Sequence, residues 1–251
     1  MVKGSSPNIV AIIQARTSAK RFPNKIFLDL KGYPLIWHVV ERIKQSKLVN
    51  KIILATTNNQ CDEELVKWSK ENRVNYFTGS ENNVLKRFYD VAKLHNADVI
   101  VRITADDPFK DPHLLDKAIS MLLTDNLDFI CNNNPPTFPE GLDVEVFTFK
   151  ALNKAFREVD SKFQKEHLTQ FFHKNKKKFK QKNISSDIDL SSYRWTIDYQ
   201  EDYEMVKVIY EKLYVKNKIF YTQEIMDLLK INPDIKEINS VSLRSHMYRN
   251  R

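Results

Sequence analysis

The sequence predicts an α/β fold built on a mainly parallel, doubly wound sheet, and three observations lead to this prediction. Apolar runs of strand length alternate with segments whose apolar residues recur at helical spacing. The alternation gives five successive β–α units before residue 132, which favours parallel strands joined by right-handed crossovers. The 251 residues, 42% of them hydrophobic, suffice for one large α/β domain.

The expected elements follow in chain order. Strands are predicted over residues 9–13, 52–55, 74–77, 98–103 and 127–131, and helices over 35–43, 63–72, 84–92 and 112–123. Pro34 suits the first turn of the first helix. The pattern then changes to a loop over 132–136, an alternating strand over 142–149, helices over 150–158 and 164–174, a strand over 194–198, and helices over 203–214 and 222–229. We therefore expect one domain over residues 1–251, in which about 133–185 form a small mixed α+β excursion from the sheet.

Composition argues against several classes of protein. The net charge of +8 comes from scattered cations without a nucleic-acid-binding motif, so we expect no nucleic-acid partner. The lysine-rich segment 174–182 is typical of a solvated helix end and turn. The sequence holds no apolar run long enough for a membrane span, and residues 1–7 lack the apolar middle of a signal peptide. Cys61 and Cys131 follow no metal-binding spacing and are predicted to be buried thiols in a cytoplasmic protein.

The most informative segment is the loop over residues 14–25, which directly follows the first predicted strand. It carries four cations, Arg16, Lys20, Arg21 and Lys25. Ligands of open α/β sheets bind outside the carboxyl ends of the strands, and arginine and lysine together suit a polyphosphate. The alternative is a surface loop with cations that have no ligand.

Carboxylates follow two other predicted strands. Asp106 and Asp107 come after residues 98–103, and Asp198 ends residues 194–198. Mg²⁺ prefers oxygen ligands and is often held by one or two carboxylates together with substrate phosphates, so Asp106 and Asp198 are candidate metal ligands. Asp-Asp-Pro is also good turn chemistry, which leaves a structural role open. Glu201 and Asp202 are interpreted as residues of a helix start.

Weaker signals complete the candidate site. Thr56 follows the second strand, while Ser80 and Arg87 lie before and within the third helix, where they could contact a nucleotide. Asp143 and Glu145 share one face of a predicted strand. His167 lies in a predicted helix, where a structural role is the alternative. The sequence contains no Walker loop, no dinucleotide-binding glycine motif and no nucleophile elbow.

These motifs together resemble those of the cytidylyltransferases that make CMP-activated sugars. The similarity is greatest to the SpsF-type polysaccharide biosynthesis subgroup, whose first loop typically reads IIQARMGSTRLPGK where this chain reads IIQARTSAKRFPNK. The other matching segments are ATTNN at 55–59, GSENNVLKR at 79–87, VRITADDPFKDP at 101–112, FPEGLDVEVF at 138–147, EHLTQ at 166–170 and TIDYQEDYE at 196–204. They keep the family order from about residue 9 to 235.

The resemblance implies a Rossmann-like nucleotidyltransferase fold and transfer of CMP from CTP to an acidic acceptor, with Mg²⁺ as cofactor and pyrophosphate as leaving product. By position, Arg16, Arg21 and Lys25 are the implied catalytic cations, and Asp106 and Asp198 the metal ligands. The remaining implied contacts are Ala15, Thr56, Ser80 and Arg87, beside Arg16 and Lys25, for the nucleotide, and Asp143, Glu145 and His167 for the acceptor. Relatives commonly dimerise, so a homodimer is expected.

The first loop departs from the subgroup pattern. Ser18, Ala19 and Lys20 replace its Gly-Ser-Thr, Asn24 replaces a glycine, and Asp107 adds a carboxylate. Asn24 can still take the left-handed conformation that glycine favours. Three alternatives stay open: a transferase for GTP or UTP, a metal-dependent glycosyltransferase, since aspartates at strand ends also bind metal–nucleotide-sugars, and a nucleotide-binding homologue with weak activity, which the loss of the loop glycines favours.

Overall fold

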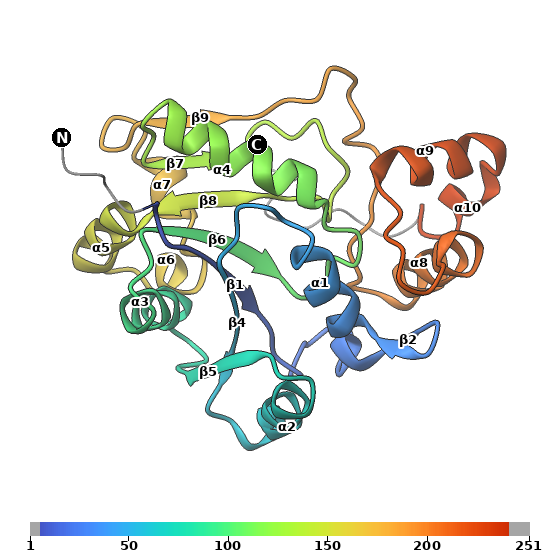
Figure 1. Cartoon of the computed structure of the whole chain (residues 1–251), viewed down its shortest axis with the longest axis horizontal. Coiled ribbons are helices and arrows are strands. Elements are labelled where there is room, and N and C mark those ends of the chain that lie inside the picture. Colours follow the sequence, from blue (N-terminus) through green and yellow to red (C-terminus); the bar gives the residue numbers. More distant parts are fainter. Residues whose placement is uncertain (1–5, 241–251) are drawn as a thin grey trace.

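The computed structural model describes residues 6–240, and its centre is a seven-stranded sheet in the order β5-β4-β1-β6-β8-β7-β9 (Figure 1). Residues 1–5 and 241–251 of the predicted domain lie outside the described residues. The strands of this sheet are β1 (Ile9–Gln14), β4 (Lys51–Thr57), β5 (Asn75–Gly79), β6 (Val99–Thr104), β7 (Phe129–Cys131), β8 (Glu145–Thr148) and β9 (Gln181–Asn183).

The parallel core of the sheet confirms the predicted β–α alternation. β1 pairs in parallel with β4 and with β6, so that Ile12 lies between Ile53 and Arg102. Strands buried on both faces read as continuous apolar runs, and β1 is such a run. The carboxyl ends of β1, β4 and β6 therefore lie at one edge of the sheet, as the sequence predicted.

Helices cover both faces of this sheet, which gives a doubly wound fold (Figure 1). One apolar cluster packs α1 (Leu35–Ile43), α2 (Glu63–Glu71), α4 (Pro112–Thr124) and α8 (Gln200–Leu213) against one face. The opposite face packs against α3 (Val84–Leu94), α5 (Phe149–Glu158) and α7 (Gln170–Lys174). The smaller elements are η1 (Lys25–Phe27), β2 (Asp29–Leu30), β3 (Tyr33–Pro34), η2 (Gln60–Asp62), α6 (Lys162–Glu166), α9 (Thr222–Ile231) and α10 (Asp234–Glu237).

The segment predicted as an excursion returns to the sheet. β8 runs antiparallel between β6 and β7, and β9 adds a parallel edge strand beside β7. β8 is fully buried apart from its last residue, because both neighbouring strands and α4 and α5 cover it. The antiparallel direction of β8 brings its first residue, Glu145, opposite Arg102 near the end of β6.

Three local predictions are wrong. Residues 194–198 form no strand and make only a bridge from Arg194 to Glu140, because the carboxylate of Asp202 binds the backbone N–H groups of Asp198 and Tyr199. The helix predicted over 164–174 is divided into α6 and α7, because His167 leaves the helical region with φ −109° and ψ 67°. Cys61 is exposed rather than buried, although its backbone carbonyl accepts a hydrogen bond from the hydroxyl of the buried Thr17.

Other predictions at the C-terminal side are confirmed. Glu201 and Asp202 lie in the first turn of α8, and Asp202 accepts a hydrogen bond from the Tyr199 N–H at 3.1 Å. Across residues 6–240, no helix has the length and apolar character that crossing a membrane requires.

Candidate active site

The cationic loop between β1 and η1 places Lys25 inside the molecule. Asn24 has φ 56°, so it takes the left-handed conformation that its amide side chain tolerates, and the chain turns inward directly after it. The Lys25 side chain is 8% exposed, and its ammonium group donates to Asp106 Oδ2 at 2.7 Å and to Asp198 Oδ1 at 2.8 Å. One cation thus joins the two predicted metal ligands.

The opposite charges of Lys25 and the two aspartates stabilise one another. Burial would lower the pKa of Lys25, but Asp106 and Asp198 hold that pKa above its usual value. Burial would likewise raise the pKa of Asp198, and Lys25, Arg21 and Arg194 outweigh this effect, so the pKa of Asp198 is lowered. Both groups therefore remain ionised at neutral pH.

Arg194 is a component of the site that sequence reasoning missed. It donates to Asp198 Oδ2 at 3.1 Å, to Glu140 at 2.8 Å and to both carboxylate oxygens of Asp202. Gly141 allows this arrangement, since it has φ 105° and a Cβ there would lie 2.7 Å from the backbone of Trp195. Arg194 follows no motif, and the signal that could have found it is its place four and eight residues before two aspartates.

Two adjoining cavities open at the carboxyl ends of the strands. One, of about 410 Å³, lies under the cationic loop, and the other, of about 300 Å³, extends toward β8 and α6. They share the lining residues Gln14, Arg16, Arg21, Thr104, Asp106 and Asp198. The combined space has the size expected of a small-molecule site.

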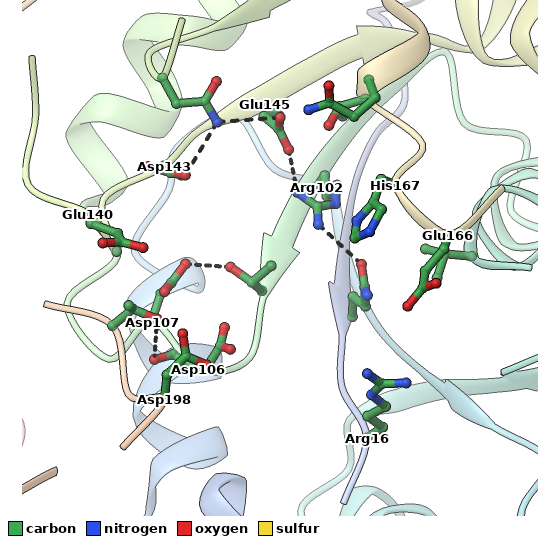
Figure 2. Close-up of a pocket in the computed structure, with 18 of the residues that line it drawn as sticks. Arg16, Arg102, Asp106, Asp107, Glu140, Asp143, Glu145, Glu166, His167 and Asp198 are labelled. Atoms are coloured by element: carbon green, nitrogen blue, oxygen red, sulfur yellow. Dashed lines mark hydrogen bonds and ion pairs between the residues drawn. The ribbon is translucent and has the colours of Figure 1, made fainter. Parts of the chain in front are cut away.

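The site has two ends, which are named here by the segments that form them. The loop end comprises Arg16, Arg21, Lys25, Asp106 and Asp198. The excursion end comprises Arg102, Asp143, Glu145 and His167 (Figure 2). In Figure 2, Asp143 and Glu145 lie on one side of Arg102 and His167 on the other, while Arg16 lies toward the opposite end of the pocket.

Glu145, which is buried, forms an ion pair with the partly buried Arg102 at the excursion end. Burial would raise the pKa of Glu145, but Arg102 and His173 hold it well below its usual range. Arg102 is a charged residue in an otherwise uncharged strand, and this signal was available in the sequence. Because this pair neutralises itself, it shapes the pocket more than it adds charge.

Asp107 and Lys110 form a second buried pair, beneath the backbone of Asp143. Lys110 Nζ lies 2.8 Å from Asp107 Oδ2 and donates to the Asp143 carbonyl at 2.5 Å. Lys110 thus offsets part of the cost of burying the additional carboxylate, and burial still raises the pKa of Asp107. Burial raises the pKa of Asp143 to about 7, and the negative charges of Asp107 and Glu145 act in the same direction. Asp143 is thus the carboxyl group at this end that changes charge near neutral pH.

Of the remaining predicted contacts, some line the cavities and others do not. Ala15 lines the cavity under the loop, and Arg87 lines the other cavity while donating to the Ser80 carbonyl at 2.7 Å. Ser80 is exposed, and Thr56 is fully buried in β4; neither is among the residues that line these cavities. His167 is half-buried, and burial lowers its pKa, so its imidazole is neutral at physiological pH.

The donor set at the loop end fits a magnesium ion. Within residues 6–240, no cluster of three or more His, Cys, Asp or Glu side chains forms a complete metal cage. Asp106 and Asp198 are nevertheless close enough to contact one ammonium group, and two carboxylates with substrate phosphates are a common magnesium environment. A bound ion there would offset the negative charge that develops on a transferred phosphoryl group.

The fold and the site define a Rossmann-like nucleotidyltransferase: cations and paired carboxylates converge at the carboxyl ends of neighbouring strands of a mostly parallel sheet. The chain belongs to the cytidylyltransferase family, whose model, described as "Cytidylyltransferase", matches residues 10–232.

This chain is similar over most of its length to proteins from several organisms. A cytidylyltransferase from Leptospira borgpetersenii has a solved structure that superposes with a TM-score of 0.89 and 31% identity, covering 96% of this chain and all of that one. The spore coat polysaccharide biosynthesis protein SpsF of Bacillus subtilis is 31% identical over 90% of this chain and 96% of its own length. An uncharacterized protein of Methanocaldococcus jannaschii is 38% identical over 96% of this chain and 98% of its own.

A more distant structure shares the fold. The CMP:2-keto-3-deoxy-manno-octonic acid synthetase, solved in complex with CTP, superposes with a TM-score of 0.63 at 17% identity, over 82% of this chain and all of that one.

Proposed function

We propose that this protein transfers CMP from CTP to an acidic acceptor, such as a sugar acid, sugar phosphate or phosphonate, and that the product serves the synthesis of a cell-surface polysaccharide. In this reaction an acceptor oxygen attacks the α-phosphorus, the bond to the bridging oxygen of the β-phosphate breaks, and pyrophosphate leaves. Where the attacking oxygen is the hydroxyl of a sugar acid, its proton is released to solvent, and where it belongs to a phosphate or phosphonate group it attacks as an anion with no proton to lose. The family and the name of the Bacillus relative support the nucleotide and the pathway class.

The observation that carries the proposal is the convergence of Arg16, Arg21 and Lys25 with Asp106 and Asp198 on one cavity. A nucleoside triphosphate and its departing pyrophosphate carry several negative charges, which arginine and lysine at fixed positions stabilise. Mg²⁺ held by Asp106 and Asp198 is part of the proposal. Lys25 then orients both carboxylates from the protein side.

The excursion end is proposed to bind the acceptor. Asp143, Glu145 and His167 present oxygen and nitrogen atoms that suit the hydroxyl groups of a sugar, and Arg102 is the cation nearest to them in the pocket (Figure 2). The homodimer expected from the resemblance stays a prediction.

The proposal is tested by incubating the protein with Mg²⁺, each of the four ribonucleoside triphosphates and a panel of acidic sugars. We expect pyrophosphate release with CTP and one acceptor class, and a CMP adduct in the mass spectrum. Release with GTP or UTP instead would correct the nucleotide. Consumption of a sugar nucleotide without pyrophosphate release would replace the proposal with glycosyl transfer.

A further inference from the structure

Thr17 closes the cationic loop from inside. Its carbonyl oxygen accepts hydrogen bonds from the N–H groups of Ala19 and Asn24, both at 2.9 Å, so the two ends of the turn meet at one backbone group. Thr17 is 3% exposed. Because Arg21 lies inside this turn and Lys25 directly follows it, the position of Thr17 determines where both cations project.

Asp62 holds Thr17 in place. The N–H and the Oγ1 of Thr17 both lie 2.7 Å from Asp62 Oδ1. Asp62 ends η2, which follows β4, the neighbour of β1 in the sheet. The cationic loop is thus attached to a second strand end as well as to its own strand.

The Asp62 carboxylate is an unusual anchor, because it is fully buried and forms no ion pair with any described residue between 6 and 240. Its second oxygen accepts from the N–H and the hydroxyl of Thr57. Burial would raise the pKa of Asp62, but the hydrogen bonds from Thr17 and Thr57 lower it. A carboxylate that stays ionised makes stronger hydrogen bonds than a neutral group.

We infer that Thr17 and Asp62 are a positioning pair, which holds the cationic loop in the shape that receives the triphosphate of the nucleotide. Neither residue lines the cavities at the strand ends, so the pair acts through Arg16, Arg21 and Lys25 rather than by contact with a ligand. The loop contains no glycine, and its conformation depends on this attachment. The kinetic consequence of the inference rests on the proposed function.

A matched pair of variants separates positioning from simple stabilisation. Thr17→Val and Thr57→Val each remove one hydroxyl group that contacts Asp62, and each also removes one backbone contact, that of Thr17 with the Cys61 carbonyl and that of Thr57 with the Asn59 N–H. Only Thr17 belongs to the cationic loop. Thr17→Ser keeps the hydroxyl and is the rescue variant.

The first measurement is hydrogen exchange of the peptide covering residues 16–25, which requires no substrate. We expect the amides of Ala19 and Asn24 to exchange about tenfold faster in Thr17→Val, since loss of a hydrogen bond to a charged group weakens closure of the loop by about that factor or more. Thr57→Val and Thr17→Ser should match the wild type. Equal exchange in Thr17→Val and wild type would overturn the inference.

The second measurement is the kinetics of pyrophosphate release. Thr17→Val should raise KM for CTP by roughly tenfold with a smaller change in kcat, because a displaced loop weakens binding of the triphosphate. Thr17→Ser should restore KM. Equal KM values for Thr17→Val and Thr57→Val would overturn the positioning role. If the wild type releases no pyrophosphate from CTP, the proposed function fails, and hydrogen exchange alone decides the inference.

Discussion

The two ends of the site hold charge in different ways. At the loop end, Lys25, Asp106 and Asp198 contact one another directly, and the opposite charges keep Lys25 and Asp198 ionised. At the excursion end, Asp143 lies beside other acids, and burial raises its pKa to about 7. The loop end thus presents a constant charge, as a polyphosphate site requires, whereas the excursion end changes charge near the pH of the cell.

The largest expected effect comes from removing the cation that joins the two carboxylates. Lys25→Met leaves Asp106 and Asp198 without their shared partner and the loop without its buried charge. We expect kcat/KM for pyrophosphate release to fall about 10³-fold, the upper range for loss of one positioned electrostatic group. Lys51→Met, at the exposed start of β4, is the control and should change little. A fall in kcat/KM of less than tenfold in Lys25→Met would show that the reaction does not depend on Lys25.

Arg194→Met tests whether the loop end depends on the buried ion pairs that Arg194 forms behind Asp198. Arg194 binds Glu140, Asp198 and Asp202, of which Asp202 is fully buried. Breaking a buried pair from one side leaves uncompensated charge, so we expect the free energy of unfolding to fall by about 3 kcal/mol in urea denaturation. Arg157→Met, on the exposed side of α5, should leave it unchanged. An equal midpoint for both variants would contradict the role of Arg194.

Asp106→Asn tests the magnesium site that we propose. The substitution keeps the shape of the side chain and removes its charge, so turnover at saturating Mg²⁺ should fall roughly 10²-fold, or about 2.7 kcal/mol on the barrier. Asp90→Asn, which alters a surface pair with Lys86, is the control. Turnover near that of the wild type in Asp106→Asn would show that Asp106 is not needed to hold a metal ion.

The smallest effect concerns the excursion end and its dependence on pH. Because the folded pKa of Asp143 is raised above its unfolded value, the folded state binds more protons between about pH 4 and 7, and this group lowers stability as pH rises through that window. Asp143→Asn should therefore gain stability relative to wild type at pH 8 compared with pH 5, by roughly 1 kcal/mol in urea unfolding.

Glu145→Gln provides the contrast to this prediction. The pKa of Glu145 is lowered, so its carboxylate is ionised in the folded state at both pH 5 and pH 8. The difference between wild type and Glu145→Gln should change little between these two pH values. If Asp143→Asn behaves in the same way, Asp143 does not titrate near neutrality.

The sequence predicted the loop end better than the excursion end, for a physical reason. Arg16, Lys25 and Asp106 follow buried strands in the chain, and parallel strands end at one edge, so their neighbourhood can be inferred without coordinates. Lys110 reaches the excursion end, and Arg194 reaches Asp198 at the loop end, through segments whose paths depend on tertiary packing. The spacing of apolar residues in the sequence does not predict such contacts.

The same distinction holds for the fold. Long periodic segments such as β1, α3 and α4 were predicted nearly to their ends, because burial on one face or two leaves a pattern in the sequence. The strand predicted over residues 194–198 failed, since Trp195 and Ile197 are buried in the apolar cluster that contains α1, α4 and α8 and not by pairing within the sheet. Burial alone does not distinguish a strand from a buried loop.

The direction of β8 has a consequence for how such a site diversifies. Since β8 enters the sheet antiparallel to β6, a single continuous stretch, residues 133–185, leaves the active edge, crosses the sheet and supplies most of the excursion end. The residues of the loop end lie outside this stretch, after β1, after β6 and before α8. The acceptor contacts that we propose therefore lie mostly on one continuous stretch, and we expect a chimera carrying this stretch from a relative to alter the choice of acceptor while the choice of nucleotide is retained.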